Sequence, residues 1–276
     1  MRLALVQQHA TLDKADNVER GLAAVDAAAA KGANLVCFAE LAFEHFHPQC
    51  PARPDHASLA EMVPGPITDA FARKAADHSL VIVLNLYERD EAGRTFDSSP
   101  VIDADGRLLG VTRMVHITDY EGFYEQGYYA AGNTGAPVYQ TKVGPVGVAI
   151  CYDRHYPEYM RALAVGGAQL VVVPQAGSVG EWPEGLYEAE MRVAAFQNGY
   201  YVALCNRVGK EDRLTFAGES FVCDAEGVVI ARAPQGEDTI LYADVNLADT
   251  AGSHARRLFF RDRRPELYAA WLRGRE

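Results

Sequence analysis

Apolar runs of strand length alternate with helical patterns along most of this chain, and this alternation is the strongest constraint on its fold. The strand-like runs cover residues 3–6, 34–38, 80–86, 145–150, 169–173 and 200–205. Apolar residues recur at helical spacing over residues 16–31, 67–78, 157–165 and 183–198. Strands that alternate with helices predict an α/β fold.

Two hairpin-like stretches interrupt the alternation. Residues 99–112 turn at Asp105-Gly106, and residues 220–233 turn at Glu226-Gly227. Because hairpins pair their strands antiparallel, we expect mixed rather than purely parallel sheets.

The chain shows no linker and no internal repeat, so we expect a single domain over residues 1–276. Its tail, from about 248 to 276, carries Arg261-Asp-Arg-Arg264. This tail suits either a solvated helical surface or an arm that packs on a partner subunit.

The charge and the cysteines limit the possible partners and the compartment. A net charge of -11 argues against binding nucleic acid or an anionic membrane. Residues 1–7 resemble a first strand more than a signal peptide, and no apolar run reaches transmembrane length. The five cysteines are odd in number and lack a disulfide spacing, which favours a reducing cytoplasm.

One cysteine, Cys151, stands where an apolar strand stops and a helix led by Pro157 is expected to start. The unpaired N–H groups of a helix N-terminus favour the thiolate and can bind a developing oxyanion. The alternative is a buried cysteine that packs as a small hydrophobe.

A carboxylate, Glu40, ends the apolar run 35–40 in the same way. Active sites of α/β sheets lie at such strand edges. A glutamate beside a thiol can take its proton and later return it to a leaving amine. Without Cys151 nearby, Glu40 would be read as a strand-end residue that faces water.

Four motifs together resemble the nitrilase superfamily of carbon–nitrogen hydrolases. They are Phe38-Ala-Glu40, Arg113-x-x-His116, Gly147-x-x-Ile-Cys151-Tyr152-x-Arg-x-x-Pro157-Glu158 and Asn206-Arg207-x-Gly209. The segments that start at Cys151, Ala189 and Cys205 are most similar to amidases that act on N-carbamoyl compounds, such as β-ureidopropionase and N-carbamoylputrescine amidase.

The resemblance implies an α-β-β-α sandwich and a Cys-Glu-Lys catalytic set that needs no cofactor and no metal. Cys151 would be the nucleophile, Glu40 the base and then the acid, and a lysine would stabilise the tetrahedral intermediate. Glu125 matches a second glutamate that positions the substrate, although a loop carboxylate in solvent is the alternative. Tyr152 would contribute its backbone N–H to the oxyanion site. The resemblance also implies a homodimer or a larger homo-oligomer.

The lysine of this set is missing. The family pattern is Arg-Lys-x-His, whereas this chain has Met114 between Arg113 and Val115. Methionine can fill the space of a lysine but has no charge and no N–H donor. Loss of one oxyanion donor typically lowers the rate by ~10²–10³-fold. The chain is therefore either a variant of an ordinary amidase or a member of a subgroup with altered chemistry.

His116 would share the face of Met114 if this segment is extended. It is the best candidate for a substitute donor, and the alternative is that it packs against or orients a neighbour. Arg154 could bind a substrate carboxylate with both of its N–H edges, or it could pair with Glu158 one helical turn away.

His45, His47 and Cys50 are expected to line a pocket wall rather than to bind zinc, because a structural zinc normally needs four ligands. We therefore predict a metal-independent hydrolase of a linear amide or N-carbamoyl group. The alternatives are a catalytically impaired or regulatory protein that binds a small amide or acid, and a nitrile-converting enzyme.

Overall fold

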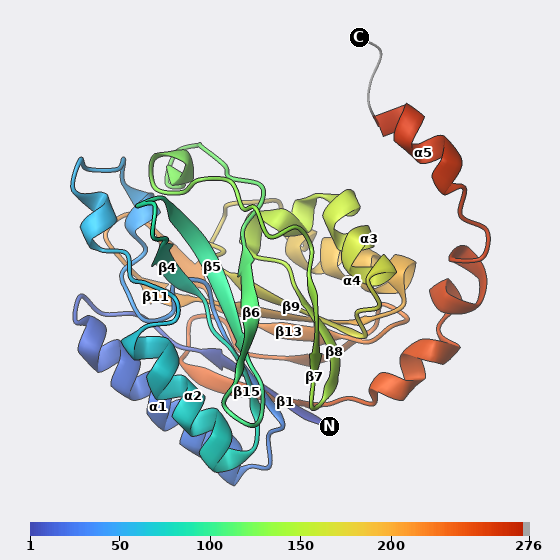
Figure 1. The fold of residues 1–276 in the computed structure, drawn as a ribbon, viewed down its shortest axis with the longest axis horizontal. Helices are drawn as coiled ribbons and strands as arrows, with labels where there is room; N and C mark the ends of the chain where they lie inside the picture. Colours follow the sequence, from blue (N-terminus) through green and yellow to red (C-terminus); the bar gives the residue numbers. More distant parts are fainter. Residues whose placement is uncertain (273–276) are drawn as a thin grey trace.

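Two β-sheets stack face to face between two layers of helices in the computed structural model, which describes residues 1–272 (Figure 1). The first sheet has the order β15-β1-β2-β3-β5-β4, and β6 pairs with β5. Its strands are β1 (Arg2–Gln7), β2 (Leu35–Phe38), β3 (Val81–Val83), β4 (Leu86–Arg89), β5 (Thr95–Ile102), β6 (Leu108–Arg113) and β15 (Thr239–Asp244).

The second sheet has the order β14-β13-β10-β9-β8-β7. Its strands are β7 (Val138–Thr141), β8 (Gly144–Val148), β9 (Leu170–Gln175), β10 (Tyr201–Asn206), β13 (Phe221–Cys223) and β14 (Val229–Arg232). A separate pair joins β11 (Val208–Lys210) to β12 (Thr215–Ala217). Both large sheets have three parallel strands at their centre and antiparallel strands outside them.

The helices cover the outer faces of the two sheets. On the first sheet lie α1 (Lys14–Ala30) and α2 (Pro66–His78), and on the second lie α3 (Pro157–Val165) and α4 (Leu186–Asn198). Strand periodicity explains these layers. In β1, Leu3 and Leu5 point into the core between the sheets, whereas Ala4 and Val6 point toward α1 and α2.

The predicted α/β class, the mixed sheets and the sandwich are confirmed. Helix α3 begins and ends at the expected residues, and the two hairpins form β5–β6 and β13–β14. The expected strand 80–86 is instead divided into β3 and β4. The division leaves Asn85 between them, where its buried side chain binds the backbone N–H of Leu41 and the carboxyl of Asp97.

The first part of the tail packs on the body of the protein, and the last part extends away from it. Arg256, in the π-helical turn η6 (Ala255–Phe259), donates hydrogen bonds to the carbonyls of Gly199, Ala164 and Ala168. Beyond it, α5 (Pro265–Leu272) stands away from the sandwich (Figure 1). The last four residues of the expected tail, 273–276, lie outside the described residues.

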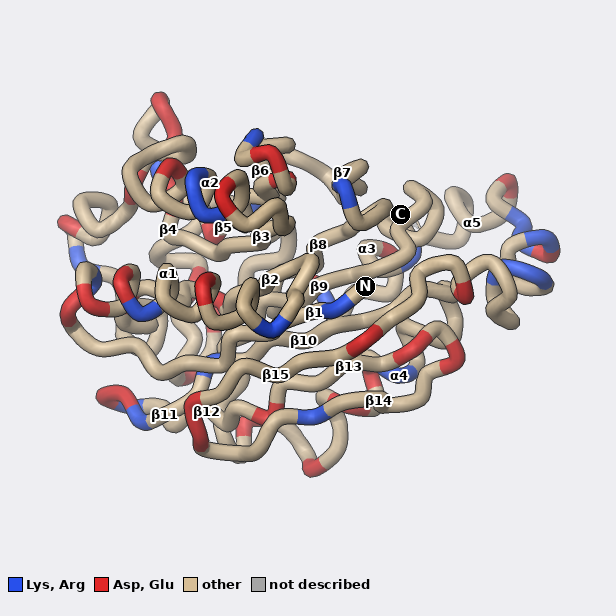
Figure 2. Tube along the Cα trace, turned by 90° about the horizontal axis from the view of Figure 1, so that it is seen from below, with Lys and Arg blue, Asp and Glu red and all other residues tan. Residues whose placement is uncertain are grey.

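Basic residues are scattered among acidic ones along the trace, and several lie close together beside α5 (Figure 2). Among the described residues, every helix is too short or too polar to cross a membrane.

Candidate active site

Cys151 follows β8 and begins the 3-10 turn η4 (Cys151–His155). Its backbone has a φ of 39°, in the left-handed region that a residue with a Cβ rarely adopts. Such strain costs of order 1–3 kcal/mol and persists only where the surroundings enforce it. The thiol is buried, with 5% of the residue exposed. A sharp turn thus presents the thiol at the carboxyl end of a central parallel strand.

Two carboxyl groups meet the thiol. Glu40 follows β2 in the other sheet, and Glu125 begins the 3-10 turn η3 (Glu125–Gly127) in the loop after β6. A carboxylate oxygen from each lies within 4.8 Å of the Cys151 Sγ and of the other. The structure therefore brings Cys151 together with Glu40, the expected base, and Glu125, the glutamate expected to position the substrate.

Burial raises the pKa values of Glu40 and Cys151, so each group releases its proton less readily. Burial, and then repulsion from Glu125, raises the pKa of Glu40 to about 7. Burial and the nearby carboxylates likewise hold the pKa of the Cys151 thiol well above its usual range. The expectation that a helix N-terminus would favour the thiolate is therefore wrong for the free site. The thiol needs a base, and Glu40 is poised to serve at neutral pH.

Met114 is buried directly after β6. It belongs to the same core cluster as Cys151 and Tyr129. Its backbone N–H donates to the carbonyl of Asp97 at 2.9 Å, and its own carbonyl accepts from Gly132. An apolar side chain thus occupies the position that the resemblance assigns to a lysine.

His116 is held by the turn that carries the nucleophile. Its Nδ1 lies 2.7 Å from Oδ1 of Asp153 in η4, and its ring stacks on Tyr156 with centroids 3.5 Å apart. The backbone N–H groups of Val115 and His116 also donate to Asp153. These contacts match the alternative in which His116 orients a neighbour, and its role as a donor to substrate stays a prediction.

Arg154 contacts the backbone of the nucleophile. Its Nη1 donates to the Cys151 carbonyl at 3.1 Å, and its Nε lies 3.4 Å from a carboxylate oxygen of Glu190. The suggested ion pair with Glu158 is therefore replaced by one with Glu190. Its buried Nη2 has no hydrogen-bond partner among the described residues, so a role in substrate binding stays a prediction, as does that of half-buried Tyr152.

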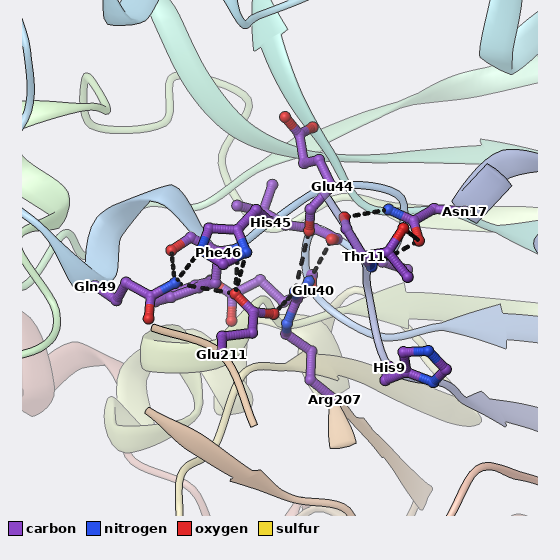
Figure 3. Close-up of polar contacts among 12 residues, drawn as sticks. His9, Thr11, Asn17, Glu40, Glu44, His45, Phe46, Gln49, Arg207 and Glu211 are labelled. Carbon is purple, nitrogen blue, oxygen red and sulfur yellow. Dashed lines mark hydrogen bonds and ion pairs between the residues drawn. The ribbon is translucent and has the colours of Figure 1, made fainter. Parts of the chain in front are cut away.

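The buried guanidinium of Arg207 supports the turn after Glu40, a role that the sequence did not reveal (Figure 3). Its Nη1 donates to the carbonyls of Glu40, at 2.9 Å, and Leu41, and its Nη2 donates to the carbonyl of Glu44 and to Glu211. Leu41 has a φ of 45°, so this turn is strained as well. Arg207 was visible in a family motif, but the sequence did not reveal its partners.

Substituting Arg207 with methionine is expected to destabilise the fold by about 3–5 kcal/mol, because it leaves Glu211 and several carbonyls without their buried partner. Thermal unfolding would measure the loss. Arg213→Met is the control, since the exposed Arg213 binds Gln49 through its backbone N–H, which the substitution keeps. Equal effects of the two substitutions would contradict the anchoring role.

Asp97, Asn85 and Tyr129 were also missed. All three are buried, and the Asp97 carboxyl and the Tyr129 hydroxyl interact electrostatically with Glu40. Asp97 escaped notice because the expected hairpin began at residue 99, whereas β5 begins at Thr95. An aspartate inside a buried strand was the available signal.

His45, His47 and Cys50 line a surface cavity of about 440 Å³, as expected for a pocket wall. Among the described residues, the group whose spacing would suit a metal is Glu40, Glu125 and Cys151. Metal ligands must be deprotonated, whereas burial raises the pKa of all three. Their environment suits proton transfer better than ligation.

Comparisons with known proteins identify the family of the chain. Residues 2–254 match the family model described as carbon-nitrogen hydrolase. An N-carbamoylputrescine amidase of Arabidopsis thaliana is 33% identical over 94% of this chain and 91% of its own. A citrullinase of Francisella tularensis is 32% identical over 97% of this chain and 96% of its own.

Solved structures share the fold over almost the whole chain. A carbon-nitrogen hydrolase from Helicobacter pylori G27 has a TM-score of 0.91 and 30% identity, covering 99% of this chain and 98% of that one. An amidase mutant from Nesterenkonia sp. AN1 carries the acetamide moiety of fluoroacetamide on its active-site cysteine. It has a TM-score of 0.82 and 25% identity, covering 98% of this chain and 96% of that one.

Proposed function

The chain belongs to the carbon–nitrogen hydrolase family, and we propose that it hydrolyses a linear amide or an N-carbamoyl compound through an acyl-enzyme on Cys151. The observation that carries this proposal is the buried thiol beside two carboxyl groups, one of which has a pKa of about 7. A base with that pKa can accept a proton and return it at neutral pH.

The reaction would proceed in two halves. Glu40 takes the Cys151 proton as Sγ attacks the carbonyl carbon, and the backbone N–H of Tyr152 donates to the oxyanion. Glu40 then protonates the departing ammonia or amine, which leaves a thioester on Cys151. In the second half, Glu40 takes a proton from water, and the resulting attack releases the acid and restores the thiol. Glu125, whose pKa burial holds well above its usual range, positions the substrate.

The pH dependence follows from the base. Only ionised Glu40 can take the thiol proton, and burial raises its pKa to about 7. We therefore expect kcat/KM to fall as pH drops below about 7, approaching tenfold per unit in acid. An acid limb near the usual value of 4.5 would contradict this assignment, and initial rates of ammonia release would locate it.

The function itself is tested by ammonia release from N-carbamoyl amino acids, carbamoyl amines, simple amides and nitriles. We expect release from at least one amide or N-carbamoyl compound, and Cys151→Ala should abolish it. Cys223→Ala is the matched control, because this buried cysteine lies in β13 away from the site. Turnover that survives in Cys151→Ala, or of nitriles alone, would refute the proposal.

The absence of a lysine at Met114 supports a second candidate, a catalytically impaired or regulatory protein that binds a small amide or acid. Intact-mass measurement after exposure to a thiol-reactive amide separates the two. An adduct confined to Cys151, together with ammonia release from a true substrate, favours the enzyme. Saturable amide binding without an adduct or turnover favours the regulator.

We further propose that the protein forms a homodimer or a larger homo-oligomer. The support is α5, which stands away from the body and exposes Trp271 and Leu272 at 66% and 65%. Exposed apolar groups of this size are typical of contact surfaces. Sedimentation of Trp271→Glu is expected to show a smaller assembly, and an unchanged mass would exclude α5 from the interface.

A further inference from the structure

Asp97 and Met114 face each other across two antiparallel strands. Ser98 pairs with Arg113 in the register of β5 and β6, so the next pair along the ladder is Asp97 and Met114. The hydrogen bond from the Met114 N–H to the Asp97 carbonyl continues the ladder. Side chains of directly opposed residues share one face, with Cβ atoms roughly 4.5–5.5 Å apart. The partner across the sheet from this buried aspartate is therefore an uncharged thioether.

The Asp97 carboxyl also meets Glu40. Its Oδ1 accepts a hydrogen bond from Asn85 at 2.6 Å, whereas its Oδ2 is buried without another donor among the described residues. Both oxygens of Glu40 are likewise buried without a donor among those residues, and the two carboxyl groups lie close enough to shift each other's pKa. Ionised carboxylates are only acceptors, so a hydrogen bond that satisfies these oxygens requires a proton on one of the two groups.

Burial, the neighbouring charges and the position of the thiol bear on whether Asp97 or Glu40 holds the proton. Burial, and then the charge of Glu40, holds the pKa of Asp97 well above its usual range, while the hydrogen bond from Asp97 lowers the pKa of Glu40. The cations that act on this site are already paired, Arg154 with Glu190 and Arg207 with Glu211. Glu40 is the carboxyl that lies within 4.8 Å of the Cys151 Sγ, so its role as the base assigns the shared proton to Asp97.

We propose that Asp97 is a positioning residue of the active site: a protonated carboxyl that donates its hydrogen bond to Glu40 and keeps that group ionised as the base. Only the kinetic consequence of this inference rests on the proposed function. The Asp97 proton is not consumed. It stays on Asp97 while Glu40 takes the thiol proton and delivers it to the leaving group, so one pair of carboxyls alternates between one proton and two.

Infrared spectroscopy tests the protonation directly and needs no turnover. The wild-type protein at neutral pH should show a carboxylic-acid C=O band that Asp97→Asn removes. Asp105→Asn makes the same chemical change on the exposed turn of the same hairpin, where the Arg107 N–H binds the aspartate, and should leave the band in place. A spectrum in which Asp97→Asn removes only carboxylate bands would overturn the proposal, even if no substrate is ever found.

Kinetics distinguish a protonated from an ionised Asp97. If Asp97 donates to Glu40, Asp97→Ala should move the acid limb of kcat/KM upward and lower the value at neutral pH by about 10- to 100-fold, the effect of one hydrogen bond to a charged group. Asp97→Asn, whose amide can still donate, should recover part of that loss. If Asp97 is ionised, both substitutions remove a repelling charge and move the limb downward, which would refute the proposal.

Discussion

Replacing Glu40 with glutamine is expected to lower kcat/KM for ammonia release by about 10²–10⁴-fold. Glutamine fills the same space but cannot accept the thiol proton. The pKa of Cys151 is held well above its usual range, so little thiolate forms without the base. Steady-state rates at pH 8 give the loss. The rate of Cys151 alkylation should fall with it, because that reaction needs the same deprotonation.

Stability measurements separate this loss of chemistry from a loss of folding. Folded Glu40 has a pKa of about 7, above its usual 4.5, so the folded protein binds this proton more tightly than the unfolded chain. The group therefore lowers stability progressively as pH rises from about 4.5 to 7, by on the order of 3 kcal/mol in full. Glu40→Gln removes this penalty and should unfold at a higher temperature than wild type at pH 8, with little difference at pH 4. If Glu40→Gln is less stable than wild type at both pH values, its inactivity would be explained by impaired folding.

Short-range patterns were sufficient to predict most of the layers. Helix α3 begins at Pro157, which suits a first helical turn, and Asp105-Gly106 and Glu226-Gly227 mark the turns of the two hairpins. Strands β7 and β15 were not predicted. Strand β15 completes the first sheet beside β1, more than two hundred residues away in the chain, and such pairing leaves no local signal.

The members of the site were predictable, but their electrostatics were not. Cys151 and Glu40 each end a strand, which local pattern reveals. The pKa values depend instead on burial and on neighbours from distant segments, and the pairing of Asp97 with Met114 depends on register. A shift of one residue would place the Asp97 carboxyl on the opposite face of the sheet. From the sequence alone, Met114 could therefore be recognised as the position of a missing lysine, but the aspartate opposite it in the sheet could not be identified.

Introducing a lysine at Met114 should show whether this pairing matters. If Asp97 is the opposed residue, the new lysine amine takes the Asp97 proton, and the resulting ammonium forms a buried ion pair with the Asp97 carboxylate. The introduced ammonium would then be bound to Asp97 and could not stabilise the oxyanion. Glu40 would also lose its hydrogen-bond donor. We therefore expect that kcat/KM of Met114→Lys does not exceed that of wild type. Met114→Leu is the matched control, because it keeps the volume and adds no charge.

The double substitution should reverse the effect. With Asp97→Asn in place, an ammonium at position 114 has no carboxylate directly opposite it and is free to stabilise the oxyanion. We expect Met114→Lys to raise kcat/KM by about 10²–10³-fold in the Asp97→Asn background, although it gives no gain in the wild-type background. Such coupling is expected of two residues in contact. A comparable gain from Met114→Lys alone would instead mean that the chain is an ordinary amidase that has lost its cation and that Asp97 is a bystander. The direction in which Met114→Lys changes kcat/KM therefore decides between two sites: an amidase site impaired by the loss of its lysine, and a site in which a proton shared by Asp97 and Glu40 takes the place of that lysine.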